Sequence, residues 1–209
     1  MPRRAPINPE GYYHVGSRGT YGQPLFRNHD QYELFLELYE RSARKYGWTT
    51  LTWALKRNHH HFVVKLTTGG LSEGMRELHG TFSRRIHAIY GQTGKGHLVR
   101  HAFFAREPYD LGDLQGACRY VDLNGYIPHG GDGSGEWRWC GYPATMGLEP
   151  PRGFHSPTEL LSLFAPHPDE ARAAYRQFID DGIAERAMTL RQTKVPEVSR
   201  GRAVIQSGS

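Results

Sequence analysis

The sequence predicts an α+β protein, a ferredoxin-like split β-α-β sandwich whose antiparallel sheet carries helices on one face, followed by a C-terminal helical extension. Strand-like and helix-like segments succeed one another in the order β-α-β-β-α-β, and a further helix follows. The 209 residues suffice for one compact domain with a small appendage, and an aromatic content of 12% argues against disorder.

The first strand and helix have clear boundary signals. Residues 11–18 (GYYHVGSR) alternate and are rich in aromatic side chains, which is typical of a strand. Either Asn28 or Asp30 is suited to cap a helix over residues 31–46, and Gly47 is suited to end it.

The next segments complete the predicted sheet. Residues 48–56 and 59–66 are rich in β-forming residues and only two residues separate them, so they predict an antiparallel hairpin. Apolar residues recur at helical spacing over residues 71–90 and again over 111–125. Between these two helices, residues 101–106 (HAFFAR) predict a short strand.

Beyond this unit the pattern becomes helical and then polar. Trp137 and Trp139 are expected to pack back on the domain, and helices are expected over residues 157–164 and 169–185. The expected division is a domain of residues 1–128, a helical extension of residues 129–191 packed on it, and a disordered polar tail of residues 192–209.

Charge and composition restrict the classes of protein. The net charge is +5, but residues 1–106 carry 16 basic and 7 acidic residues whereas residues 107–209 carry 10 and 14. A basic front half indicates a polyanionic partner such as nucleic acid, although an arginine-rich solvated surface is the alternative. Two cysteines cannot form a disulfide framework, and no apolar run approaches the ~18 residues of a membrane span. We therefore expect a cytoplasmic protein without a membrane partner.

Three consecutive histidines begin the second hairpin strand. Side chains alternate along a strand, so His59 and His61 should share one face while His60 points to the other. Two imidazoles on one face can both reach a divalent ion. The alternative is a polar patch that arose by chance, since the chain has 12 histidines and lacks the CxxC and HExxH patterns of zinc sites.

Tyr120 and Asn124 form a second constellation on the last helix of the unit. Their spacing of four residues places both on one face of that helix. By itself the pair is weak, because tyrosine is most often a packing residue. Beside a His-x-His strand in a basic ferredoxin-like domain, it becomes a candidate site.

Four segments in order carry a resemblance to a known family: GYYHVGSRG (11–19), KRNHHHFVVKL (56–66), GHLVRHAFF (96–104) and RYVDLN (119–124). Together they resemble the single-tyrosine HUH transposases, and most of all the REP-associated tyrosine transposases. The resemblance extends over roughly residues 10–185. It departs from the family at His60, where a bulky apolar residue is usual, and after Asn124, where Gly125 and Tyr126 replace the usual continuation.

The resemblance implies a metal-dependent DNA strand transferase. His59, His61 and Asn124 would hold Mg²⁺ or Mn²⁺, with no nucleotide cofactor, and Tyr120 would attack a DNA phosphate to give a 5′-phosphotyrosine intermediate. Tyr126 is a second candidate nucleophile, but Tyr120 is preferred because it alone has Asn four residues on. The alternatives are a domesticated DNA-binding protein with little catalysis and an unrelated metal-dependent hydrolase.

The implied partner is single-stranded DNA or an imperfect hairpin, bound by a monomer or homodimer at the bacterial nucleoid. Basic residues of the front half are the expected phosphate contacts. They are Arg57, Arg76, Arg84, Arg85, Lys95 and Arg100.

Overall fold

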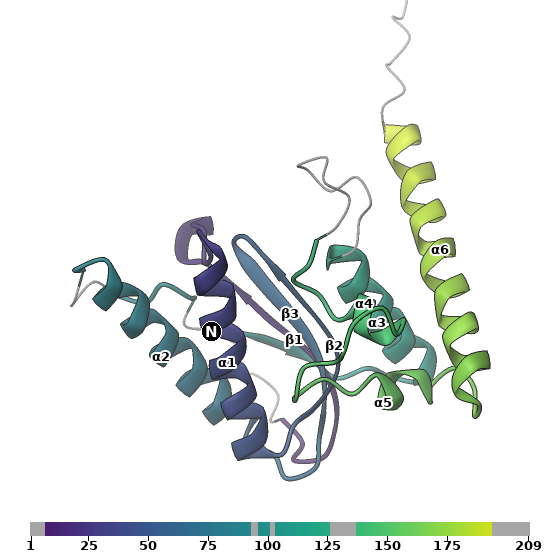
Figure 1. Ribbon diagram of the computed structural model, residues 1–209, viewed down its shortest axis with the longest axis horizontal. Helices are drawn as coiled ribbons and strands as arrows, with labels where there is room; N and C mark the ends of the chain where they lie inside the picture. Colours follow the sequence, from purple (N-terminus) through teal and green to yellow (C-terminus); the bar gives the residue numbers. More distant parts are fainter. Residues whose placement is uncertain (1–6, 93–95, 101–102, 126–136, 194–209) are drawn as a thin grey trace, which may run out of the picture.

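The computed structural model describes residues 7–92, 96–100, 103–125 and 137–193, with the side chains of residues 190–193 left out (Figure 1). Four strands form one antiparallel sheet in the order β2-β3-β1-β4. The strands are β1 (Gly11–Arg18), β2 (Thr49–Lys56), β3 (His59–Leu66) and β4 (Phe104–Arg106). This arrangement confirms the predicted α+β, ferredoxin-like fold.

Two long helices connect the strands, and four more helices follow the sheet. Asn28 caps the first of them through its side chain, which accepts a hydrogen bond from the Gln31 amide, and Gly47 ends it in a left-handed conformation. The helices are α1 (His29–Tyr46), α2 (Leu71–Ile89), α3 (Leu111–Gly125), α4 (Tyr142–Thr145), α5 (Pro157–Leu161) and α6 (Pro168–Thr193).

Helices cover both faces of the sheet (Figure 1). On one face, α1 and α2 bury alternate strand residues such as Val15 and Phe62. On the other face, α3 and α5 cover the residues between them, such as Ala54 and Val63, and α6 packs on α3. The expectation of helices on one face only was therefore wrong. Strand β3 is apolar at consecutive positions, and such a strand is stable when both of its faces are covered.

The segment after residue 136 returns to the sheet, as its two tryptophans predict. The Trp139 ring stacks on Tyr32 of α1, with ring centroids 4.5 Å apart. The Trp137 indole Nε1 donates to the Leu55 carbonyl at 2.5 Å. These contacts fasten the C-terminal part to both α1 and β2.

Several predicted boundaries move. The strand expected over residues 101–106 begins at Phe104 among the described residues, and the helix expected to reach Phe164 ends at Leu161. The last helix runs on past Glu185 to Thr193. Within this added length Arg186 reaches back to α3, where its guanidinium donates to the Leu123 carbonyl at 2.9 Å. Of the polar tail, residues 194–209 lie outside the described residues.

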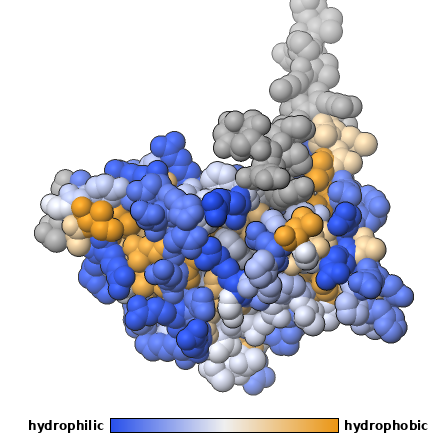
Figure 2. Space-filling view, viewed as in Figure 1, coloured by the Kyte–Doolittle hydropathy of each residue, from blue (hydrophilic) through white to orange (hydrophobic). Residues whose placement is uncertain are grey.

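The surface is mostly polar. On the face that Figure 2 displays, apolar residues form small patches separated by hydrophilic ones. Among the described residues, no helix combines the length and apolar character that a bilayer crossing requires.

Candidate active site

Three imidazoles lie on the sheet face that α3 covers. In the β-ladder, His61 pairs with Gly16 of β1 and with Ala54 of β2, and His59 pairs with Arg18 and Lys56. The rings of His59 and His61 are 5.2 Å apart between centroids, so the two side chains project from the same face. The third imidazole belongs to His14 of β1, whose ring centroid lies 5.2 Å from that of His61.

His14 was not identified from the sequence. Its Nε2 lies 3.1 Å from Nδ1 of His61 in a buried hydrogen bond. Gly16 makes this approach possible, because a Cβ at that position would lie only 3.0 Å from His61 Nδ1 and 2.6 Å from the Phe104 ring. The signal was present in the strand GYYHVGSR, but it becomes readable only when the register between β1 and β3 is known.

The hydrogen bonds of the three imidazoles leave one ring nitrogen of His59 and one of His61 available to bind a metal. His59 Nδ1 lies 2.8 Å from Asn58 Oδ1, and since an amide oxygen only accepts, the proton is on Nδ1. When His61 Nδ1 donates to His14 in the same way, Nε2 of both His59 and His61 carries a free lone pair. Neighbouring groups that fix the tautomer of a metal-binding histidine are a general feature of such sites.

Burial keeps these histidines neutral. Desolvation, followed by the charge of Arg106, lowers the pKa of His14 to about 4. Desolvation likewise lowers the pKa of His61 to about 3, and it lowers the pKa of His59 together with the nearby charge of Arg18. Neutral imidazole is the form that binds metal, so these side chains need lose no proton at neutral pH to act as ligands.

Helix α3 places Tyr120 over this face. The Tyr120 ring centroid lies 5.5 Å from those of both His14 and His61, yet the side chain remains 46% exposed. Leu114, Cys118 and Val121 of the same helix are buried against the sheet and its neighbours. The apolar side of α3 thus holds the helix down while the tyrosine stays accessible to a substrate.

A buried carboxyl fixes the position of α3. Asp122 accepts hydrogen bonds from the Thr52 hydroxyl of β2 and from the Tyr175 hydroxyl of α6. Desolvation raises the pKa of Asp122 to about 7, although both hydrogen bonds act in the opposite direction. The helix is therefore connected to the sheet below it and to α6 above it, two residues from Tyr120.

Asn124 lies one turn after Tyr120. Its Nδ2 donates to the Tyr120 carbonyl at 2.8 Å, which leaves the amide oxygen Oδ1 as the atom able to bind a cation. The next residue, Gly125, packs so closely that an added Cβ would lie 3.3 Å from that of Ala54, the strand partner of His61. The end of α3 that carries Asn124 therefore lies above β2, the neighbour of the histidine-bearing strand β3.

The donor set fits a divalent cation. Two neutral imidazole nitrogens from β3 and one amide oxygen from α3 are donor types that such a cation accepts, and imidazole favours Mn²⁺ over Mg²⁺. In the part of the chain that the structure describes, no three or more His, Cys, Asp or Glu side chains are grouped to hold a metal. An asparagine as the third ligand is compatible with that finding, and the predicted ligand set remains a prediction.

The predicted DNA contacts separate into two groups. Arg57, in the β2–β3 turn, and Arg100, whose amide donates to the Arg18 carbonyl, are exposed at the end of the sheet where His59 lies. Three other arginines are exposed on α2, which covers the opposite face: Arg76, Arg84 and Arg85. Lys95 and the alternative nucleophile Tyr126 lie outside the described residues.

Comparison with known proteins gives a family match. Residues 9–128 match the family model described as transposase IS200 like. No curated protein matches the sequence at a significant level. The fold is similar to that of a REP-associated tyrosine transposase solved with a REP hairpin, with a TM-score of 0.55 and 17% identity over 75% of this chain and 88% of that one. A protein from Deinococcus radiodurans R1 assigned to the transposases gives a TM-score of 0.41 and 12% identity, over 58% of this chain and 96% of that one.

Proposed function

The chain belongs to the IS200-like transposase family, and from that membership we propose that it cleaves and rejoins DNA strands through a covalent bond to Tyr120. One observation carries the proposal. Tyr120 is half-exposed on a helix that is fixed to the sheet, and the centroid of its ring lies 5.5 Å from the ring centroids of the neutral His14 and His61. A nucleophile that is open to solvent beside a candidate cation site is the arrangement that phosphoryl transfer requires.

The proposed reaction exchanges one phosphoester bond for another. The Tyr120 phenol oxygen attacks the scissile phosphorus, the bond from phosphorus to the 3′ oxygen breaks, and a 5′-phosphotyrosine forms. The proton lost from the phenol is matched by one taken up by the departing 3′ oxygen. Because the tyrosyl ester conserves the phosphodiester bond, attack by a 3′ hydroxyl reverses the exchange and rejoins strands without a nucleotide cofactor.

Residues of this chain have distinct roles in the proposal. His59, His61 and Asn124 would hold Mg²⁺ or Mn²⁺, and members of the family generally use a divalent metal. Bound there, the ion supplies positive charge that polarises the scissile phosphate. His14 keeps His61 oriented through their hydrogen bond. Asp122 keeps α3, and with it Tyr120, at a fixed height above the sheet.

The proposed substrate is single-stranded DNA or an imperfect hairpin. A neighbour with this fold was solved with a REP hairpin, and the basic front half of the present chain suits a polyanion. We assign catalysis to residues 1–128 and a supporting role to the helical extension of residues 129–191. The protein would act as a monomer or homodimer on the bacterial nucleoid.

A denaturing gel tests the nucleophile. Protein is incubated with Mn²⁺ and with labelled hairpin DNA from the region that flanks its gene. We expect a covalent band with the wild type and with Tyr126→Phe, and none with Tyr120→Phe. Because Tyr120→Phe removes one oxygen and keeps the ring, it should bind the DNA with nearly the wild-type affinity.

Three outcomes would contradict the proposal. A band that persists in Tyr120→Phe and vanishes in Tyr126→Phe would transfer the role to Tyr126. A wild type that binds the hairpin but forms no band would favour a domesticated DNA-binding protein. Hydrolysis of phosphoesters that survives in Tyr120→Phe would favour an unrelated metal-dependent hydrolase.

A further inference from the structure

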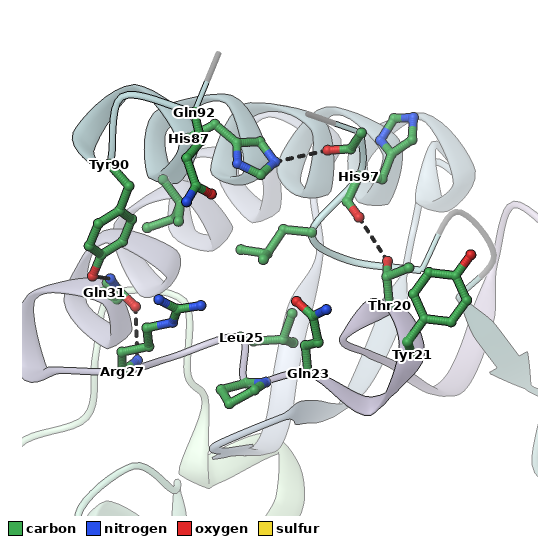
Figure 3. Close-up of a pocket in the computed structure, with 14 residues that line it drawn as sticks. Thr20, Tyr21, Gln23, Leu25, Arg27, Gln31, His87, Tyr90, Gln92 and His97 are labelled. Atoms are coloured by element: carbon green, nitrogen blue, oxygen red, sulfur yellow. Dashed lines mark hydrogen bonds between the residues drawn. The ribbon is translucent and has the colours of Figure 1, made fainter. Parts of the chain in front are cut away.

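A polar cavity of about 590 Å³ lies between the segment that joins β1 to α1 and the end of α2 (Figure 3). One wall is the segment between β1 and α1, which contributes Tyr21, Gln23 and Arg27. The other wall is the end of α2 with the segment after it, which contributes His87 and Gln92. Figure 3 shows Gln23 and Arg27 extending from the first wall toward the second. Nothing in the proposed strand-transfer chemistry uses this cavity.

Hydrogen bonds join the two walls, so the cavity is preformed. Gln31 accepts from the Arg27 amide at 2.8 Å through Oε1 and donates to the Tyr90 hydroxyl at 2.7 Å through Nε2. The Thr20 hydroxyl donates to the His97 carbonyl at 2.8 Å, and the Thr20 amide donates to the Leu98 carbonyl at 3.0 Å. A ligand that binds in a preformed site loses little binding free energy to ordering of the protein.

The chemistry of the walls suits a nucleotide. Arg27, His87 and His97 line the cavity, and among the described residues that line it none is acidic. Gln23 and Gln92 each offer an amide donor and an acceptor, which can match the hydrogen-bonding edge of a base. The Arg27 guanidinium lies over the Tyr90 ring, 5.4 Å from its centroid, so the cationic group is already held in place.

Tyr21 is the most unusual residue of the cavity. Its side chain is 91% exposed, and its φ of 56° makes it the one non-glycine residue with positive φ in the described part of the chain. An aromatic residue held in this conformation costs free energy, and such strain is often found where a ligand binds. An exposed aromatic ring at the edge of this polar cavity is a surface on which a nucleobase can stack.

The first wall of the cavity is joined by hydrogen bonds to the end of the sheet that carries His59. The Gly19 amide donates to the Asn58 carbonyl at 2.8 Å, and the Asn58 side chain in turn contacts His59. Three exposed arginines add positive charge at this end of the sheet. They are Arg18, Arg57 and Arg100.

We propose that this cavity binds one unpaired nucleotide of the DNA, next to the segment that is cleaved, with its base stacked on Tyr21. The inference rests on the proposed function, because it takes DNA to be the substrate. It adds a site for single-stranded DNA on the edge of the molecule, at a distance from Tyr120 and the histidines.

Fluorescence anisotropy with two labelled probes tests the inference. One probe is a blunt hairpin, and the other is the same hairpin with a short single-stranded thymidine flank. Tyr21→Asn removes the ring and keeps a residue that tolerates positive φ. Since a base that stacks on an aromatic side chain gains affinity from that contact, affinity for the flanked probe should fall about tenfold while affinity for the blunt probe is unchanged.

The control is Tyr109→Asn, which removes another tyrosine that is 92% exposed but lies outside the cavity. It should bind both probes as the wild type does. A second measurement replaces a flank thymidine with 5-iododeoxyuridine and maps the photocrosslink by mass spectrometry. We expect it on the tryptic peptide of residues 19–27, which contains Tyr21.

Failure of the inference and failure of the proposed function give different results. If Tyr21→Asn binds the flanked probe as tightly as the wild type does, the cavity is not a nucleotide site, and covalent adduct formation by Tyr120 still stands. In the opposite case, the wild type forms no adduct, yet Tyr21→Asn binds the flanked probe more weakly than the wild type does. The nucleotide site is then supported and strand transfer is not.

Discussion

Two adjacent histidines of β3 have opposite environments. His60 faces α1 and α2, where it is fully buried between Phe35 and Phe62, and its Nε2 lies 3.0 Å from Nε2 of His79. His61 faces α3, where it lies under the half-exposed Tyr120 and contacts His14. Burial lowers the pKa of both imidazoles, so both are neutral at pH 7.

The difference between the two faces is therefore access, and charge state does not distinguish them. On the α1–α2 face, aromatic rings surround His60, and its Nδ1 finds no hydrogen-bond partner among the described residues. On the α3 face, the helix packs mainly on β2, and Tyr120 beside His61 is 46% exposed, whereas His61 itself keeps 7% of its surface exposed and His60 none. The same residue type serves packing on one face and, in the proposed function, binds the metal on the other.

The largest expected effect is on covalent adduct formation, when histidines on one face or the other are replaced. His61→Ala should abolish covalent adduct formation, since it removes a predicted ligand, while DNA affinity stays near that of the wild type because phosphate contacts dominate binding. The double variant His60→Leu/His79→Leu replaces a buried pair by apolar side chains of similar size and leaves neither imidazole unpaired. It should form the adduct at nearly the wild-type rate, as the gel with labelled hairpin would measure.

Equal loss of the adduct in both variants would remove the functional distinction between the faces. Circular dichroism of each variant must first show a folded protein. A folded double variant that forms no adduct would mean that the buried pair controls the position of His61.

How far the sequence reaches also differs between the faces. Period-two alternation was enough to place His59 and His61 together, because the side-chain direction of a strand depends only on the strand itself. His14 required the register between β1 and β3, which depends on tertiary pairing. The Asp122 contacts required three elements, β2, α3 and α6, to meet, and no local pattern contains that information.

The fold was predictable for similar reasons. Strands β1 and β3 begin and end where alternation and turn residues indicate, since these signals are local. The cover on the second face and the length of α6 were not, because they depend on partners distant in sequence. Arg186 of α6 illustrates this, as its contact with the Leu123 carbonyl of α3 joins two residues that are 63 positions apart.

An intermediate effect is expected in the pH dependence of stability. Burial lowers the pKa of His79 to about 3 and that of His60 well below 6.5. Below about pH 6.5, these two histidines therefore bind protons in the unfolded chain and remain neutral in the folded protein. Stability from these groups is present above about pH 6.5 and is lost as the pH falls, at most at about 1.4 kcal/mol per pH unit for each histidine. Asp122, with its pKa raised to about 7, opposes this trend between about pH 4 and 7.

Urea unfolding at pH 7 and pH 5 measures the difference. The wild type should lose free energy of unfolding on acidification, because several buried histidines outweigh the single carboxyl. His60→Leu/His79→Leu should lose clearly less over the same interval. If the two proteins lose the same amount, the buried pair is not neutral in the folded state, and the comparison of the two faces would need another basis.

The smallest expected effect concerns the basic residues on either side. Arg57 and Arg100 are exposed at the end of the sheet that carries His59, whereas Arg84 and Arg85 are exposed on α2 across the sheet. A phosphate contact that is lost lowers DNA affinity and reduces the dependence of log affinity on log salt by about 1 per contact. Arg57→Glu/Arg100→Glu should therefore flatten the salt dependence, and Arg84→Glu/Arg85→Glu, which changes the net charge equally, should leave it nearly unchanged.

Anisotropy titrations of both double variants between low and physiological salt measure these slopes. Because the two variants share the same change in net charge, a long-range electrostatic effect would lower both affinities alike, whereas direct contacts would separate them. A larger effect from Arg84 and Arg85 would place the DNA on the α1–α2 face. In that case the bound strand would have to cross the edge of the sheet to reach Tyr120, and the nucleotide cavity between β1 and the end of α2 would lie on its path.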